Sequence, residues 1–394
     1  MTRHLHVALI VETSSIYGRQ ILRGITRYVR SHHPWSLFFE QRDLGALPPA
    51  WFTRWRGDGV ICRVINPPLA RQLHRSKIPV VNLNDIHSGL GFPLIRSDDQ
   101  AIGRLAAEHL LERGFRHFAF CGFSGQDWSG RRGAAFRAAL QTAGFACPVY
   151  ESSWGGPNAP PWEDEQDEIG QWIQTLPRPL GVMACNDVRG QHVLDSCQRV
   201  QTSVPEEVAV IGVDNDEVLC ELCDPPLSSV VPNPEQIGYE AAALLDRLMA
   251  GEKPPEQEKL IEPLGLVARQ SSDVLAIDDP LIVSAVRYIR EHACQGATVQ
   301  DVLKQVPLSR TILEHRFRKY LGRSPRAEIR AVQLKRVKQL LAETDLSLER
   351  IALLAGYEHP EYMSVVFKRQ TAQTPGQYRR VAQSAAVQKG RPSV

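Results

Sequence analysis

The last hundred residues contain the same pattern twice, with corresponding positions fifty residues apart. Phe317 corresponds to Phe367 and Pro325 to Pro375, and each copy predicts a helix, a tight turn and a second helix. A short helix–turn–helix unit that occurs twice is typical of chains that present two helices to DNA. The repeat therefore predicts an all-α domain with two DNA-binding units in this part of the chain.

The first copy has clear signals for where its helices begin. Thr298 and Asp301 have the spacing of a capping box, and Ser309 is a good N-cap for the next helix. In that helix Leu313 and Phe317 recur every four residues, so we expect both to be buried. The polar groups at its start and on its outer face can reach base edges or phosphates; they are Ser309, Arg310, Thr311, Glu314, His315 and Arg318.

The second copy repeats this arrangement after Ser347, with Met363 and Phe367 facing inward. A long helix that begins at Ser324-Pro325 joins the copies and would set their separation. The outward residues of the second copy that we expect at DNA are His359, Glu361, Ser364 and Lys368.

Three motifs lie within residues 280–382: Ile351-Ala-x-x-x-Gly356-Tyr, Tyr362 with Phe367-Lys368, and Thr374-Pro375-x-x-Tyr378-Arg379. With these motifs the region resembles the DNA-binding domain of AraC/XylS-type regulators. The chain departs from that family at Val365, where a basic residue is common, and at Ala372, where glycine is common. The resemblance implies double-stranded operator DNA as a partner and a contact with RNA polymerase.

The charge distribution agrees with nucleic-acid binding by the repeat. From residue 278 onward 20 Lys and Arg stand against 11 Asp and Glu, a net charge of +9. The preceding residues carry 26 basic against 33 acidic side chains, a net charge of −7, and the two parts together give the +2 of the whole chain. A helical bundle that binds nothing would not explain why the positive excess falls on the repeat.

Several classes of protein lack support in the sequence. The apolar run Val7–Val11 is too short for a secretory signal, and no run approaches the ~18 apolar residues of a membrane span. Cys220 and Cys223 have metal-ligand spacing, but two further ligands at matching spacing are absent. We therefore expect a cytoplasmic protein with no metal, no cofactor and no catalytic residues.

Residues 1–275 alternate strands and helices, which predicts a parallel sheet with helices on both faces. In such sheets ligands bind beyond the carboxyl ends of the strands. Polar side chains gather at these ends, at Glu12–Ser15, Asn82, Asn84, Asn186-Asp187 and Asp214-Asn215.

The same residues resemble the effector domain of LacI/GalR-type regulators. This resemblance implies an α/β two-lobed, periplasmic-binding-protein-like (type I) sensor with a sugar between its lobes. It implies that the chain crosses between lobes near Gly122, Ser229 and Gly265, and that the protein is a homodimer. It is carried by Ser97-Asp98-x4-Gly103, Arg132-x-x-Ala-Phe136, Ala184-x-Asn186-Asp187 and Val210-Ile-Gly-Val-Asp214-Asn215.

The implied ligand contacts suit a sugar, because arginine and carboxylate groups can each hold two vicinal hydroxyls and an aromatic ring can cover an apolar sugar face. Each has an alternative. Trp128 could pack between the lobes, Asp98 could cap the helix at Ala101, and Asn186 or Asp187 could cap the helix that follows them. The implied contacts are Tyr17, Arg19, Asp98, Trp128, Arg132, Asn186 and Asp214.

The order of the domains, sensor first and DNA-binding unit second, is the reverse of that in LacI-type regulators. It is similar to that of regulators of pentose operons, which implies an activator with D-xylose as its effector. We predict a sensor at 1–275, a linker at 276–283, a DNA-binding domain at 284–384 and a disordered tail at 385–394. The alternatives are a regulator that responds to another monosaccharide, or a sugar-binding transport component or enzyme with an accessory helical tail. For an enzyme, Asp98 with Asp214 is the candidate acid/base pair.

Overall fold

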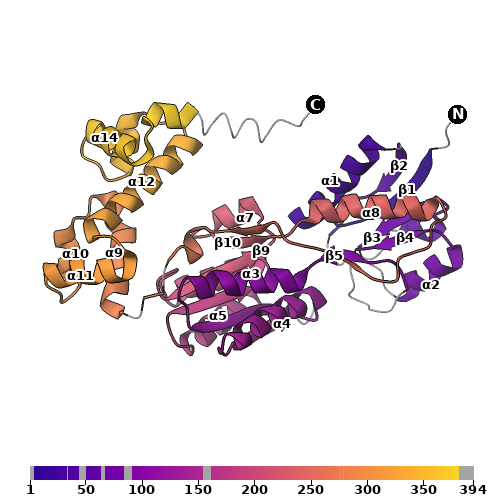
Figure 1. The fold of residues 1–394 in the computed structure, drawn as a ribbon, viewed down its shortest axis with the longest axis horizontal. Helices are drawn as coiled ribbons and strands as arrows, with labels where there is room; N and C mark the ends of the chain where they lie inside the picture. Colours follow the sequence, from indigo (N-terminus) through magenta and orange to yellow (C-terminus); the bar gives the residue numbers. More distant parts are fainter. Residues whose placement is uncertain are drawn as a thin grey trace. The chain divides into compact units, whose positions relative to one another are not determined.

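The protein is described from a computed structural model that covers residues 4–32, 34–43, 50–63, 67–83, 91–153, 161–274, 276–277 and 279–380. The chain divides into two compact units, residues 1–274 and 275–394 (Figure 1). The predicted tail at 385–394 lies outside the described residues. Helix α9 begins at Pro280, inside the predicted linker, because the Asp279 side chain accepts hydrogen bonds from the backbone N–H groups of Leu281 and Ile282.

The first lobe of the first unit is a four-stranded parallel sheet in the order β2-β1-β3-β4. Its strands are β1 (Leu5–Ile10), β2 (Trp35–Phe39), β3 (Gly59–Cys62) and β4 (Val80–Asn82), and its helices are α1 (Ile16–Ser31), η1 (Ala50–Arg54), α2 (Pro67–Ser76) and α8 (Pro234–Met249).

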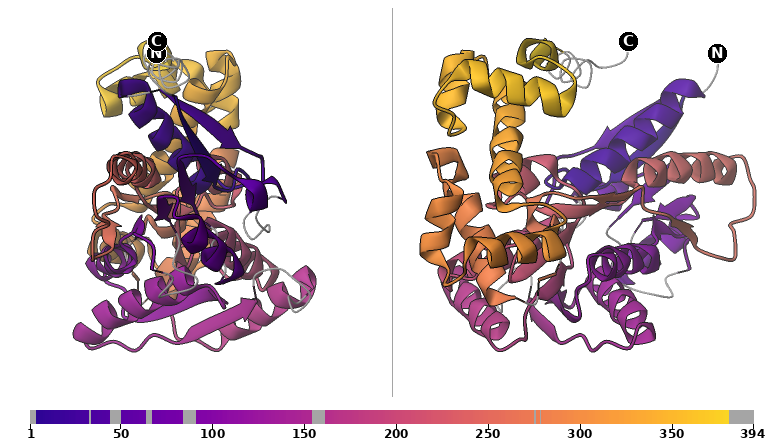
Figure 2. Two further views of the ribbon diagram at one scale, coloured as in Figure 1. Left: turned by 90° about the vertical axis from the view of Figure 1, so that its right-hand side faces the viewer. Right: turned by 60° about the vertical axis from the view of Figure 1, so that its left-hand side comes forward.

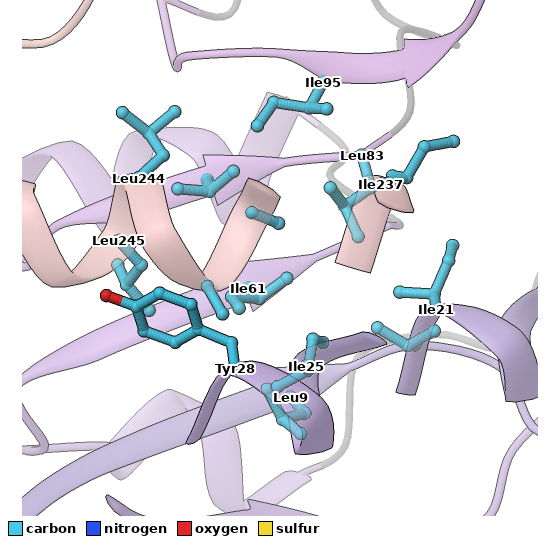
Figure 3. Packing of buried hydrophobic residues seen from close by; sticks show 14 of the residues in the cluster. Leu9, Ile21, Ile25, Tyr28, Ile61, Leu83, Ile95, Ile237, Leu244 and Leu245 are labelled. Carbon is cyan, nitrogen blue, oxygen red and sulfur yellow. The ribbon is translucent and has the colours of Figure 1, made fainter. Parts of the chain in front are cut away.

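Helices α1 and α8 come from opposite ends of this unit's sequence and pack side by side. Figure 3 shows Ile21 and Ile25 of α1 with Leu244 and Leu245 of α8 in one apolar cluster that also contains strand residues such as Ile61. The two backbones approach closely at Gly24, where a Cβ atom would lie 1.9 Å from the Glu235 carbonyl oxygen. Only glycine fits between helices at this separation.

The second lobe is a six-stranded sheet in the order β12-β10-β9-β8-β6-β7. All its described pairings are parallel except that of β10 with β12, which is antiparallel. The strands are β6 (His117–Ser124), β7 (Val149–Ser153), β8 (Leu180–Ala184), β9 (Val208–Val213), β10 (Ser228–Val231) and β12 (Gly265–Val267). The helices of this lobe are α3 (Asp99–Glu112), α4 (Asp127–Thr142), α5 (Trp162–Gln174), α6 (Asp187–Arg199), α7 (Glu217–Leu222) and η2 (Gln270–Ser272).

The prediction of a crossing near Gly122 is wrong, because Gly122 lies inside β6. The chain crosses after β5 (Ile95–Ser97), whose Ile95 belongs to the core of the first lobe, while the next helix, α3, packs on α4. It returns after β10, close to the predicted Ser229, and crosses again between β11 (Lys259–Ile261) and β12, which starts at the predicted Gly265. Strands β5 and β11 pair in parallel as a separate two-stranded sheet.

The second unit is all-α, as the repeat predicts. The capping box of Thr298 and Asp301 is confirmed, and Leu313 and Phe317 are buried in the first helix–turn–helix as Met363 and Phe367 are in the second. The elements are α9 (Pro280–His292), η3 (Ala293–Gln295), α10 (Val299–Gln305), α11 (Arg310–Leu321), α12 (Pro325–Glu343), α13 (Leu348–Leu354) and α14 (Pro360–Thr371).

Candidate functional site

A cavity of about 260 Å³ opens in the first unit where the carboxyl ends of the strands of both lobes converge. The loop after β1, the residue after β3, and β5 contribute its wall from the first-lobe side, and the starts of α3, α4 and α6 with the loop after β9 contribute from the second. This is the position at which parallel α/β sheets bind ligands. Of the predicted ligand contacts, five line it: Tyr17, Trp128, Arg132, Asn186 and Asp214.

Arg132 is held in one orientation by three partners. Its Nε donates to Asp99 Oδ1 at 3.1 Å and its Nη1 to the Cys185 carbonyl oxygen at 2.7 Å, while Nη2 lies 3.6 Å from Asp214 Oδ1. Burial lowers the pKa of Arg132, but the nearby Asp214 and Asp99 carboxylates raise it by more. The pKa of Arg132 is therefore above its ordinary value. A cation fixed in this way is preorganised to donate to a ligand.

Asp214 follows β9 with an unusual backbone. Its φ of 111° and the 48° of Asn215 are positive, a region that L-residues rarely adopt. The turn is held by β10, since the Asp214 N–H donates to the Val230 carbonyl oxygen and the Asn215 N–H to Ser229 Oγ. Burial raises the pKa of Asp214 to about 6, although Arg132 and Arg63 pull it down. Strain of this kind is commonly retained where a side chain must point into a site.

The start of α6 contributes one capping group and one buried acid. Asn186 Oδ1 accepts a hydrogen bond of 2.9 Å from the Arg189 N–H, so Asn186 is the N-cap as well as part of the wall. Asp187 accepts from Ser229 Oγ at 2.6 Å and from the Asp216 N–H at 2.8 Å. Burial, and then Asp214, raise the pKa of Asp187 to about 8. Asp187 therefore braces the turn that carries Asp214.

The two predicted aromatic side chains each lie beneath an arginine. The Tyr17 hydroxyl is 2.8 Å from Ser97 Oγ, and the Arg63 guanidinium lies 4.4 Å from the centre of the Tyr17 ring. The Arg132 guanidinium lies 5.1 Å from the centre of the Trp128 ring. Both contacts are within the range of cation–π attraction.

Two predicted contacts are not in the wall of this cavity. Asp98 is the N-cap of α3, where its side chain accepts from the Ala101 N–H at 2.9 Å. Arg19 is exposed and donates to the carbonyl oxygens of Thr13 and Ser14 at 2.8 and 3.1 Å, so it braces the loop after β1. Because Asp98 points elsewhere, the candidate acid/base pair of Asp98 with Asp214 is not assembled in the cavity.

Sequence reasoning missed several charged wall residues, among them Asp99 and Arg63. Asp99 accepts from Arg131 Nε at 2.9 Å and from Arg132. Arg63 pairs with the buried Glu12 and, because of burial, has a pKa lowered to about 10. Arg63 could have been found, because it directly follows β3 at the same sheet edge as the other candidates. Asp99 could not be distinguished from Asp98, since only the helix geometry decides which of the two caps.

In the second unit the predicted DNA contacts lie at the starts or on the outer faces of α11 and α14. Ser309 caps α11 by accepting from the Ile312 N–H at 3.3 Å, and His359 holds the N-cap position of α14. Glu314 and Ser364 are half-buried, and Glu314 lies 3.4 Å from Arg310. The exposed members of the set are Ser309, Arg310, Thr311, His315, Arg318, His359, Glu361 and Lys368.

Family models match three parts of the chain. They are described as "XylR N-terminal domain" at residues 6–89, "Periplasmic binding protein-like domain" at 107–272 and "Helix-turn-helix domain" at 302–381. The chain is 34% identical to the xylose operon regulatory protein of Escherichia coli K12 over 96% of this chain and 98% of that protein. It is 31% identical to the protein of the same name from Haemophilus influenzae, again over 96% and 98%.

Solved structures agree with this similarity. The structure of a protein described as "xylose-binding transcription activator xylR" matches 96% of this chain and 99% of its own with a TM-score of 0.81 and 33% identity. A cellobiose complex of the regulator CelR matches 68% of this chain and 84% of its own with a TM-score of 0.56 and 22% identity, which supports the fold of the sensor alone.

A two-lobed cavity-bearing unit followed by two helix–turn–helix units defines the class of sugar-responsive, DNA-binding transcription regulators. Within that class, the chain belongs to the family of xylose operon regulatory proteins, as the similarity over nearly its whole length shows. In the described part of the chain no helix is long and apolar enough to cross a membrane.

Proposed function

We propose that the protein is an activator of pentose utilisation that binds D-xylose in the cavity between its lobes. The observation that carries this proposal is the wall in which Arg132, Asp214 and Asn186 lie beside two aromatic rings. Carboxylate and guanidinium groups can hold neighbouring hydroxyls, and a ring can cover the apolar face of a pyranose. The names of the full-length relatives support D-xylose as the particular sugar.

The charges of the wall favour a neutral sugar over a sugar acid or a sugar phosphate. Every arginine of the wall has a carboxylate partner. Arg63 is paired with Glu12, Arg96 with Asp99 and Glu258, Arg131 with Asp99, and Arg132 with Asp99 and Asp214. An anionic ligand would therefore have to compete with carboxylates that already neutralise these guanidinium groups. A neutral ligand needs only to add hydrogen bonds to the pairs, and this costs less desolvation.

On DNA, we infer that α11 and α14 enter successive major-groove segments on one face of the duplex, about one turn or ~34 Å apart. The predicted contacts comprise cations that can neutralise phosphates or read guanine, such as Arg310 and Lys368, and uncharged donors such as Thr311 and Ser364. They also include the carboxylates of Glu314 and Glu361, which can accept a hydrogen bond from cytosine. The net positive charge of this part of the chain supports the same inference.

The proposed setting is a homodimer in the cytoplasm whose DNA-bound form contacts RNA polymerase. One full-length relative of known structure is called a transcription activator, and this supports a positive effect on transcription. Symmetric dimers are the commonest arrangement among soluble oligomers, and they pair naturally with repeated sites on DNA.

Calorimetric titration of the full-length protein with aldopentoses, aldohexoses and aldonates tests the sugar assignment. We expect D-xylose to give the tightest binding and D-xylonate to give none. Saturable binding of D-xylonate with tighter affinity than D-xylose would overturn the assignment. Incubation with pentoses, followed by analysis for products, separates a regulator from an enzyme, since turnover would contradict the proposal.

A further inference from the structure

The two helix–turn–helix units do not share one apolar core. The first cluster contains Phe317 and receives Ile329 from the beginning of α12, and the second contains Phe367 and receives Val337 from the middle of the same helix. Helix α12 runs as one continuous helix between the two groups of helices (Figure 2). If α12 were the only connection, any bending of this helix would change the angle between the two helix–turn–helix units. Further contacts between the units therefore affect how both of them bind DNA.

Gln333 lies on α12 between the residues that serve the two cores, and it is 7% exposed. Its Nε2 donates two hydrogen bonds of 3.1 Å, one to the carbonyl oxygen of Ala293 and one to that of Gly356. Ala293 begins η3 in the first helix–turn–helix unit, and Gly356 forms the turn between α13 and α14 in the second helix–turn–helix unit. One amide group therefore ties the backbone of both units to α12.

The backbones of the two units also touch at this point. Gly356 has a φ of 75°, and a Cβ atom there would lie 2.5 Å from the Ala293 carbonyl oxygen. No side-chain atom fits into this contact. The Gln333 amide lies against the carbonyl groups of Ala293 and Gly356. Buried polar groups that are fully satisfied make a contact of this kind rigid and specific.

We propose that Gln333 is a positioning residue that fixes the angle between the two DNA-binding units and so selects the spacing of the two half-sites they bind. Gln333 itself contacts no base. The inference rests on the proposed binding of both α11 and α14 to DNA. Inserting one base pair between half-sites rotates the second by roughly 34° and moves it by about 3.4 Å, because B-DNA repeats every ~10.5 base pairs. A locked pair of units cannot follow that rotation.

The test uses the full-length protein and a duplex that the wild-type protein selects from a random pool in the presence of D-xylose. A footprint locates the two half-sites, and duplexes with one base pair added or removed between them are compared by equilibrium binding. We expect wild-type affinity to fall at least about tenfold on either change, as for the loss of one correct base contact. Wild-type protein that binds all three spacings equally well would overturn the proposal without any variant.

The variant Gln333→Met keeps the length of the side chain and removes both donors. We expect it to bind each isolated half-site as the wild type does, and to bind all three spacings with similar affinity. Gln339→Ala, at an exposed glutamine on the same helix, is the matched control and should retain wild-type discrimination. Circular dichroism verifies that each variant is folded. Wild-type discrimination in Gln333→Met would overturn the proposal, whereas failure to enrich any duplex would instead contradict DNA binding by these helices.

Discussion

At the scale of single residues, the cavity depends on carboxylates whose surroundings differ. Asp99 receives hydrogen bonds from three arginines, Asp187 is buried beneath the turn after β9, and Asp214 reaches the cavity from that turn. We therefore propose that Asp99 and Asp187 hold the wall in place and that Asp214 accepts from a sugar hydroxyl.

Replacing Asp214 with alanine should weaken D-xylose binding at least about tenfold. The variant loses a charged hydrogen-bond acceptor and one carboxylate partner of Arg132, a loss of about 1.5–3 kcal/mol. Titration calorimetry measures the effect, and affinity for DNA without sugar should stay near the wild-type value. Asp164→Ala, at an exposed position of α5, is the control. Equal sugar affinity in Asp214→Ala and the wild type would place the binding site elsewhere.

Sugar affinity should also depend on pH through Asp214. The pKa of Asp214 is raised to about 6. The carboxylate is therefore ionised at pH 8 and becomes protonated as the pH falls through its pKa. If the sugar prefers the ionised acceptor, its dissociation constant should be level above pH 7 and rise by up to about tenfold per pH unit below 6. Titrations from pH 8 to pH 5 measure this, and Asp214→Asn should flatten the profile. A wild-type profile that is flat over this range would contradict the role given to Asp214.

At the scale of elements, helices that pack against each other differ in role from helices with an exposed polar face. The contact of α1 with α8 closes the first lobe around residues from both ends of the sensor, and glycines bring the two backbones together there. The exposed faces of α11 and α14 have no such packing, and they carry polar side chains that we propose contact DNA. We expect substitutions at the α1–α8 contact to change the stability of the sensor, and substitutions on the exposed faces of α11 and α14 to change DNA binding.

Gly24→Ala should destabilise the sensor, because the added methyl group would overlap the Glu235 carbonyl oxygen. Overpacking of this kind costs about 1–3 kcal/mol, which thermal unfolding would report as a lower Tm. Gly130→Ala is the control, since Gly130 lies in α4 with no atom within 4 Å of its Cβ position. There alanine should raise the Tm slightly, by its better helix propensity. A Tm for Gly24→Ala at or above that of the wild type would show that the helices can separate without cost.

Arg310→Ala and Lys368→Ala should each weaken binding to the selected duplex. A side chain that reads a base contributes about 1–3 kcal/mol and its loss relaxes the preference at one position, whereas loss of a phosphate contact weakens binding to all sequences and lowers the salt dependence. Binding isotherms at several salt concentrations distinguish the two roles. Lys253→Ala, at an exposed lysine of the sensor, should change neither. Footprints identical to wild type for both variants would exclude these positions from the interface.

At the scale of the whole molecule, the sensor and the DNA-binding unit should be coupled by the sugar. We expect the lobes to close around the ligand, and a coupling free energy of ~1–3 kcal/mol is typical of such switches. Linkage requires the same factor in both directions, so D-xylose should change DNA affinity and DNA should change D-xylose affinity equally. Calorimetry with and without the selected duplex measures the second factor. If DNA leaves sugar affinity unchanged, the sugar is not the effector.

The sequence by itself determined the elements and their class. Caps at Thr298 and Ser309 and the four-residue recurrence of Leu313 and Phe317 are local signals, so the helix–turn–helix units and their buried faces could be predicted and are confirmed. The alternation of strands and helices likewise predicted the α/β sensor, and the rule that ligands bind at carboxyl ends pointed to Asp214. Arg132, which lies inside α4, was implied by the resemblance to LacI/GalR-type regulators.

Only the tertiary structure decided what depends on direction and on distant partners. Which of Asp98 and Asp99 faces the cavity depends on how α3 is capped, and the point at which the chain first leaves the first lobe depends on the packing of β5 rather than on any signal near Gly122. The roles of Arg63 and Gln333 arise from groups far away in the sequence, at Glu12 and at two backbone carbonyls. Periodicity and capping specify a residue's own element, whereas the partner of a buried charge or amide is chosen by how the elements pack.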